Sequence, residues 1–371
     1  MMKASKKFWI VLLCITFVAG MTLAGCGGGG TAGGNAAAAD PGAAEKVFKW
    51  RLVTHQTPGT ARYDATVIPF CETVKTASNG RLIIEPFGGG ALFPVSDSLD
   101  QIMNGVVEMG AIWSGYWGGK DPIFNLAGGI PGDPLYGFEE HCYRVEQQDP
   151  ILRAAYEKYG VTYLGMFDYA GRDILMSNKP VRSVEDFRGL NVRTSGIGAE
   201  FYKALGANGV SVPGGEVYTA MQLGTVDAAE YNDWIVNKEM GFDEVTSYVI
   251  EPSMHNGVLS DKDLIVNPKA WNELPDDLKA IVLAARDGAR YNSSQKFGVM
   301  SKLSATDWRE EGVEVIELPE ADVARMEDIA FEFLLNYKNS NPSTVEFVEK
   351  YAEVLNDLGY TEQAQKLGYG G

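Results

Sequence analysis

Short strand-like segments that alternate with helical patterns constrain the fold of this chain more than any other feature of its sequence. Four of them come first, at residues 47–53, 81–87, 108–114 and 161–167. A second series of strand and helix patterns follows between residues 183 and 231, and long helical patterns begin at Pro275 and Pro319. Repeated β-α-β units predict mainly parallel sheets with helices over their faces. We therefore expect an α/β fold of two lobes, with a ligand cleft between the lobes and a long helix toward the C-terminus.

The length of 371 residues is sufficient for two domains of ordinary size. Together with the N-terminal composition, the two series of strands and helices predict five consecutive parts. These are a lipoprotein signal peptide (1–25), a flexible tether rich in glycine and alanine (26–45), lobe I (46–170), lobe II (171–260) and a helical C-terminal region that packs on both lobes (261–371).

The first 25 residues have the organisation of an export signal. Three lysines precede an apolar run that starts at Phe8, and small residues lead to Cys26. The run is shorter than the roughly 20 apolar residues that span a bilayer. The tetrapeptide Leu23-Ala24-Gly25-Cys26 resembles a bacterial lipobox, which implies lipid on Cys26 and an extracytoplasmic protein tethered to a membrane, in the periplasm or at the cell surface. An ordinary secretory signal with an incidental cysteine is the alternative.

The charge and the cysteines exclude some classes of protein. A formal net charge of −17 argues against nonspecific nucleic-acid binding, which needs positive charge facing phosphate. An anionic small ligand stays compatible, because a few arginines dominate the field inside a pocket. Beyond the signal and the lipid site, Cys71 and Cys142 remain, either as a disulfide or as two separate buried thiols. Their spacing does not indicate a zinc site.

Polar and aromatic side chains follow several predicted strands, and ligands of open α/β sheets bind at the carboxyl ends of strands. Planar, permanently charged guanidinium groups at such ends suit bidentate recognition of a carboxylate, although either arginine alone is also compatible with a salt-bridged surface position. Aromatic residues among glycines suit the wall of a site, and a packed loop corner is the alternative. The candidate ligand-binding residues are Trp113, Tyr116, Trp117, Tyr169, Arg172, Arg193, Glu230, Tyr231, Asn232, Trp234 and His255.

The segment Ser177–Arg193 resembles the stretch that marks the substrate-binding subunits of tripartite ATP-independent periplasmic (TRAP) transporters. The resemblance continues in order and spacing over nearly all of residues 46–340, with Gly206-Ala207, Val212-Pro213, Glu216-Val217-Tyr218, Ala220-Met221-Gln222, Gly224 and Val226–Glu230. The aromatic loop that ends in Gly119-Lys120-Asp121-Pro122 is similar to that of the branch binding 2-oxo or 2-hydroxy monocarboxylates. A two-lobed fold of the periplasmic-binding-protein type is what this resemblance implies.

The resemblance also implies roles for matching positions. Arg193 would pair with the ligand carboxylate, and Arg172 matches a second arginine of many members. Because the monocarboxylate branch often has glutamine near Arg172, acids other than keto acids also fit. Glu230 and the carbonyl of Tyr231 would contact a calcium or sodium ion. His255 would precede a second acidic residue in that branch, and the Asn256 found here leaves the metal site incomplete.

The same resemblance places Trp113, Tyr116 and Trp117 along the wall of the first lobe and Trp234 at the mouth of the site. The expected partners are a small organic anion, the membrane permease of a TRAP transporter and, through the lipid anchor, a membrane surface. No nucleic acid and no obligatory cofactor are expected, and monomer and homodimer are both open.

Delivery of an organic acid to the permease is therefore the predicted function, and enzymatic activity is not expected. A secreted hydrolase would need a nucleophile and a base in one site. The three histidines, His55, His141 and His255, lie in no known nucleophile motif, and the sequence contains neither a Gly-x-Ser-x-Gly elbow nor a His-Glu-x-x-His helix. A ligand-sensing partner of a signalling receptor would use the same kind of site and is the second alternative.

Overall fold

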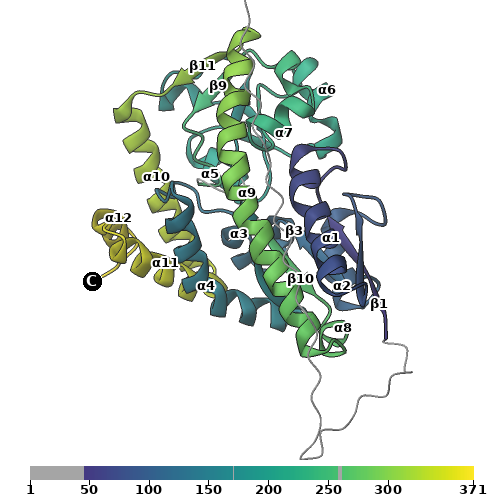
Figure 1. Ribbon diagram of the computed structural model, residues 1–371. Helices are drawn as coiled ribbons and strands as arrows, with labels where there is room; N and C mark the ends of the chain where they lie inside the picture. The colour runs from purple at the N-terminus through teal and green to yellow at the C-terminus, as the bar shows by residue number, and fades with distance from the viewer. Residues whose placement is uncertain (1–45, 170, 258–260) are drawn as a thin grey trace, which may run out of the picture. The chain divides into compact units, whose positions relative to one another are not determined.

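The computed structural model describes residues 46–169, 171–257 and 261–371, which contain two β-sheets with helices on both faces of each (Figure 1). The predicted signal peptide, the tether and Cys26 lie outside the described residues. Within the described part, no helix combines the length and the apolar character needed to cross a bilayer.

The first sheet has five strands in the order β2-β1-β3-β10-β4. Strand β1 pairs in parallel with β2 and β3, whereas β10 lies antiparallel between β3 and β4. The strands are β1 (Phe48–Thr54), β2 (Leu82–Phe87), β3 (Met109–Ile112), β4 (Thr162–Tyr169) and β10 (Asp261–Val266). The helices around it are η1 (Tyr63–Val67), α1 (Ile68–Ala77), η2 (Val95–Asp97), α2 (Ser98–Met103), η3 (Ser114–Trp117), α3 (Ile123–Gly128), α4 (Phe138–Lys158), α8 (Pro268–Asn272), η7 (Pro342–Thr344), α11 (Val345–Asp357) and α12 (Thr361–Lys366).

Both faces of the first sheet are apolar because neighbouring residues of a strand point to opposite sides. Leu52 of β1 packs in the core that contains Phe70 of α1, and the adjacent Val53 packs in the core that contains Tyr156 of α4. Each fully buried side chain of this size contributes about 1.5–3 kcal/mol of transfer free energy. In the first half of β1 the apolar residues alternate with the exposed Lys49 and the half-buried Arg51, and burial on both faces begins at Leu52.

The second sheet has six strands in the order β11-β9-β5-β8-β6-β7. Strand β5 lies antiparallel between β8 and β9, and the other pairs are parallel. The strands are β5 (Leu175–Ser177), β6 (Asn191–Arg193), β7 (Asn208–Val210), β8 (Ala228–Glu230), β9 (Tyr248–Glu251) and β11 (Glu314–Glu317). The helices around it are η4 (Val184–Phe187), α5 (Ile197–Ala204), η5 (Gly214–Glu216), α6 (Val217–Gln222), α7 (Trp234–Glu239) and η6 (Phe242–Val245).

Two long helices, α9 (Asp276–Glu310) and α10 (Glu320–Ser340), contribute to the cores of both sheets. Leu278 of α9 packs in a core of the first sheet, and Trp308 near its other end packs in a core of the second sheet. Figure 1 shows α9 as the long green helix that passes both groups of strands. Likewise, Met326 of α10 packs with the second sheet and Leu334 with the first. These two helices hold the sheets in one unit.

The α/β fold and the long helix toward the C-terminus are confirmed, as are the strand-like segments of both series. The prediction of mainly parallel sheets is wrong for β5 and β10, which run antiparallel to both of their neighbours. Strands β10 and β11 also lie within the range 261–371, for which the sequence predicted only helices. Cys71 and Cys142 do not form a disulfide with each other; Cys71 is buried, as the second of the two alternatives expects, whereas Cys142 is only partly buried.

Strand β10 carries a lysine in the interior of the first sheet. Lys262 lies directly opposite Asp168 of β4, and the two side chains form a close ion pair. Both residues are buried, with exposed fractions of 2% and 0%. Burial lowers the pKa of Lys262 to about 8, while the carboxylate of Asp168 favours the charged form. The pair compensates two charges that the sheet could not otherwise accommodate.

We predict that Asp168→Asn lowers the free energy of unfolding by about 3–5 kcal/mol, because it leaves the ammonium group of Lys262 buried without a counter-charge. Urea unfolding followed by circular dichroism measures the change. The control is Glu185→Gln, which removes one partner of the exposed Arg325–Glu185 pair and should leave the unfolding midpoint unchanged. Equal midpoints for Asp168→Asn and wild type would contradict this account.

Candidate functional site

Arg193 is the last residue of β6, and its guanidinium group is held in a fixed position. Its Nε donates to the carbonyl of Val212 at 3.2 Å, and its Nη1 donates to the carbonyl of Glu230 at 2.6 Å. Only 9% of the residue is exposed, and the guanidinium carbon lies 5.6 Å from the centre of the Tyr231 ring. Within the described residues these contacts use Nε and Nη1, so Nη2 is available to a ligand.

Glu230, the last residue of β8, lies beside Arg193. Its Oε1 is 3.5 Å from Nη1 of Arg193 and accepts hydrogen bonds from the backbone nitrogen (2.7 Å) and the hydroxyl (3.2 Å) of Ser195. Its Oε2 lies 3.9 Å from Nε2 of His255. The carboxylate is only 3% exposed, so these partners stabilise a charge that is almost fully removed from water.

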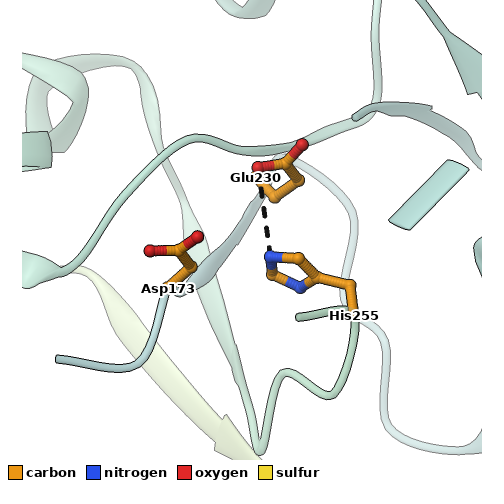
Figure 2. Close-up of side chains that lie close together, drawn as sticks. All are labelled: Asp173, Glu230 and His255. Carbon is orange, nitrogen blue, oxygen red and sulfur yellow. Dashed lines mark ion pairs between the residues drawn. The ribbon is translucent and has the colours of Figure 1, made fainter. Parts of the chain in front are cut away.

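Asp173, Glu230 and His255 form a buried cluster in which one ligand atom from each residue lies within 4.8 Å of the others (Figure 2). Nδ2 of Asn256 donates to Oδ2 of Asp173 at 3.2 Å, and Nδ1 of His255 lies 3.0 Å from the hydroxyl of Tyr202. The other donor atoms of two members, Oδ1 of Asp173 and Nε2 of His255, have no hydrogen-bond partner within the described residues. The cluster therefore contains buried polar atoms that are poised for a further partner.

Burial shifts the pKa values of two members of this cluster in opposite directions. It raises the pKa of Asp173 to about 7, with the like charge of Glu230 acting in the same direction. It lowers the pKa of His255 to about 4, against the opposing attraction of Glu230. At neutral pH the imidazole is therefore neutral, as a ligand to a cation requires.

Aromatic residues from the loop after β3 approach this cluster from the first sheet. The indole nitrogen of Trp113 donates to the carbonyl of Gly128 at 2.7 Å, and a Cβ atom added at Gly196 would lie 2.9 Å from the Trp113 ring. Tyr116 packs edge-on against Trp113 with the ring centres 5.4 Å apart. Although 43% of Tyr116 is exposed, burial of its hydroxyl, aided by the neighbouring Tyr231 and Glu230, raises its pKa to about 12.

Three predicted site residues have other roles in the structure. Trp117 is turned into the core by the short helix η3, packs against Phe124 with ring centres 6.0 Å apart and is 1% exposed, so its assignment to the wall is wrong. Trp234 is 6% exposed and packs edge-on against Trp308, which corrects its assignment to the mouth of the site. Asn232 shapes a turn, because its Oδ1 accepts from the backbone nitrogen of Asp233 at 2.9 Å.

Two further predicted residues flank the crossing between the sheets. Arg172 stacks over the ring of Tyr136 at 4.6 Å and lies close enough to His255 to act on its pKa. Tyr169 is the last residue of β4, and its side chain is not among the described groups. The structure therefore brings Trp113, Tyr116, Arg193, Glu230, Tyr231 and His255 together and leaves Arg172 at the edge of this group.

Direct contacts join the two sheets next to the cluster. Nη2 of Arg62, which precedes η1, donates to Oδ2 of Asp233 at 2.6 Å, and both residues are almost completely buried. Oδ1 of the same aspartate caps α7 by accepting from the backbone nitrogens of Ile235 and Val236. The carboxylate of Glu239 at the other end of α7 accepts from the backbone nitrogen of Ala61 at 2.9 Å.

The sequence did not identify Asp173, Ser195, Tyr202 or Arg62 as parts of the site. Asp173 directly follows the candidate Arg172 at the crossing between the sheets, so it could have been identified from its position in the sequence. Ser195 follows Arg193 by two residues and could have been found in the same way. Tyr202 and Arg62 lie on helical segments, where a single polar residue is indistinguishable from a surface residue.

Comparisons with known proteins point to one family of solute-binding proteins. The profile of the family described as bacterial extracellular solute-binding protein, family 7 (DctP), matches residues 53–339. A monocarboxylate 2-oxoacid-binding periplasmic protein of Nostoc sp. is 25% identical over 327 residues, which cover 86% of this chain and 88% of that protein.

Solved structures share the fold. A TRAP periplasmic solute binding protein from Colwellia psychrerythraea with bound calcium and pyruvate has a TM-score of 0.75 and 24% identity, covering 86% of this chain and 99% of that one. A TRAP transporter solute binding protein from Bordetella bronchiseptica, with copurified calcium and picolinate, has a TM-score of 0.75 and 23% identity, covering 86% and 95%. The two-sheet arrangement is therefore shared with these proteins.

We predict that the metal-free protein becomes less stable as the pH rises toward and through about 7, because of Asp173. The folded protein keeps the proton on Asp173 up to a pH at which the unfolded chain has already released it. The resulting stabilisation is complete below the ordinary aspartate pKa of about 4 and is lost as the pH rises through the folded value. Asp173→Asn removes this dependence.

His255 requires a control, because its lowered pKa has the opposite effect. Its contribution is present above the ordinary histidine pKa of about 6.5 and is lost as the pH falls through about 4. Thermal unfolding of wild type and Asp173→Asn in the presence of chelator, from about pH 5 to 8.5, isolates Asp173 as the difference between the two curves. Parallel curves would show that Asp173 titrates normally.

Proposed function

Because this chain belongs to family 7 of the bacterial extracellular solute-binding proteins, the DctP family of TRAP receptors, we propose that it captures a small organic acid and delivers it to a TRAP-type permease. The family consists of solute-binding receptors and is not an enzyme family. The ligand class is a small monocarboxylate, in agreement with the 2-oxoacid-binding protein of Nostoc and the pyruvate bound to the Colwellia protein. The permease itself is a separate partner.

The observation that carries this proposal is the fixed, buried guanidinium group of Arg193. It sits at the carboxyl end of β6, where ligands of α/β sheets bind, and two carbonyls hold it in place. An arginine with a free Nη2 group pairs with a carboxylate at low entropic cost, because little side-chain motion is left to lose. Tyr231 lies beside this group, and Trp113 and Tyr116 cover it from the first sheet.

Binding is coupled to the contacts between the sheets. We propose that the two sheets with their helices act as lobes I and II, and that the Arg62–Asp233 and Ala61–Glu239 contacts belong to the closed arrangement. A ligand favours closure only through its extra affinity for the closed state. Removal of water strengthens the pairing between the acid and Arg193, and the permease would recognise the closed receptor.

A cation fits beside the carboxylate site. Glu230, with the carbonyl of Tyr231, is the proposed position for the ion, and the partnerless Oδ1 of Asp173 supplies a second buried oxygen. Asp173 therefore compensates for the acidic residue that Asn256 replaces. A bound cation would neutralise the two acidic side chains and attract the ligand carboxylate, in agreement with the calcium found in the two solved relatives.

The test is a calorimetric titration of the purified protein with a panel of 2-oxo, 2-hydroxy and aromatic monocarboxylates, with calcium or with chelator. One acid should bind, and Arg193→Ala should weaken it by at least about 30-fold, because one partner of a buried charge pair is lost. Arg182→Ala is the matched control, since the side chain of Arg182 pairs with Glu314 at the exposed surface. An affinity that is unchanged in Arg193→Ala would reject this site. The absence of binding to every acid of the panel would reject the function.

We also propose that Cys26 carries lipid and that residues 26–45 tether the receptor to the membrane surface. This follows from the Leu23-Ala24-Gly25-Cys26 sequence and its glycine-rich continuation. Cys26→Ser should move the exported protein from the membrane fraction to the soluble fraction, as measured by fractionation and detergent phase partitioning. Unchanged partitioning would show that Cys26 is not the anchor.

A further inference from the structure

The cluster of Asp173, Glu230 and His255 contains a nitrogen donor, which the site proposed above for calcium does not use. Nε2 of His255 has no hydrogen-bond partner within the described residues, and the residue is 1% exposed. Figure 2 shows this nitrogen directed toward Glu230, whose Oε2 is 3.9 Å away. A buried polar atom without a partner destabilises the folded protein, so a ligand for this nitrogen is the expected compensation.

Carboxylate oxygens of Asp173 and Glu230 join the imidazole nitrogen of His255 in a set of donors that is common at metal sites in proteins. Oδ1 of Asp173 also has no partner within the described residues, although the residue is 6% exposed. One donor atom from each of the three residues lies within 4.8 Å of the donor atoms of the other two. A separation of 3.9 Å between two donors is one that an ion with bonds of about 2.0–2.4 Å can span.

Each of the three side chains is held by a second residue. The hydroxyl of Tyr202 lies 3.0 Å from Nδ1 of His255. Ser195 donates twice to Oε1 of Glu230, and Nδ2 of Asn256 donates to Oδ2 of Asp173. For Glu230 and His255 the partner engages the atom that is not part of the 3.9 Å approach between them, and for Asp173 it leaves Oδ1 without a partner. Metal-binding side chains are typically oriented by such outer contacts.

From this arrangement we propose that Asp173, Glu230 and His255 bind a divalent metal ion of the zinc or cobalt type in preference to calcium. Calcium and magnesium take oxygen ligands, whereas imidazole suits the first-row transition metals. Three protein ligands leave further coordination positions open. The inference about the ligand rests on the proposed function. An acid that fills these open positions needs a second donor atom next to its carboxylate, so the ligand class is a chelating acid.

Charge balance supports the same assignment. The two carboxylates and one ligand carboxylate carry three negative charges, and Arg193 with a divalent ion carries three positive charges. Arg193 lies 3.5 Å from Glu230, so all of these groups belong to one buried site. Neither the metal nor the acid alone neutralises it, and we therefore expect each to bind more tightly in the presence of the other.

The experiment uses the full-length protein without a histidine tag, purified in detergent and stripped with a chelator. Calorimetric titration with Zn²⁺, Co²⁺, Mn²⁺ and Ca²⁺ should give affinities for zinc and cobalt at least about 100-fold higher than for calcium. Co²⁺ should also give visible absorption bands that indicate nitrogen ligation.

His255→Gln should weaken cobalt binding by at least about 100-fold and alter its spectrum while leaving calcium affinity nearly unchanged, because an amide oxygen replaces the nitrogen donor. Tyr202→Phe, which removes only the outer contact, should cost about 10- to 100-fold. His55→Gln is the matched control, because His55 directly follows β1 and is not a member of the cluster, so the change should not alter metal binding. Circular dichroism of each variant in chelator verifies folding.

Calcium affinity equal to that of zinc and cobalt, or a cobalt spectrum unchanged in His255→Gln, overturns the inference. The proposed function is tested separately by the acid panel. If acids bind through Arg193 while His255→Gln leaves metal binding unaltered, only the metal assignment fails. If cobalt binds as expected and no acid binds with or without it, only the organic-acid function fails.

Discussion

The buried carboxylates of Asp173 and Glu230 determine how the surrounding chain is arranged. An isolated charge in a protein interior costs several kcal/mol unless partners compensate it. Arg193 and Ser195 supply these partners to Glu230, and Asn256 supplies one to Asp173. Because the partners come from different strands and from the loops that follow them, the site exists only when the strands of the second sheet hold their register.

The search for polar and aromatic residues that directly follow predicted strands found the centre of the site from the sequence. It succeeded because it depends on the alternation of strands and helices, which is clear in this sequence. It located Arg193, Glu230 and His255, which the structure brings together. It failed for Trp117, since one turn of the short helix η3 is enough to direct a side chain into the core instead of the site. A strand-end position therefore predicts proximity more reliably than it predicts side-chain direction.

The parts that could not be predicted share a physical reason. Strand β5 has three residues, too few to show a period, and β10 begins with charged residues that normally indicate a surface turn. Lys262 becomes compatible with the interior only because Asp168 lies opposite it, and this partner is 94 residues distant in sequence. Tyr202 is similar, since its role in the site depends on its contact with His255, which is 53 residues away in sequence. Long-range pairs of this kind are invisible to local patterns.

The position of β10 between β3 and β4 has a consequence for how the molecule is made. During synthesis, residues 46–169 would emerge with a gap in the middle of their sheet, which is filled only when Asp261–Val266 leaves the ribosome. The second sheet likewise waits for Glu314–Glu317 before its edge strand β11 is present. The first sheet is therefore complete only after five strands of the second sheet have already been synthesised, so the two sheets are interleaved along the chain.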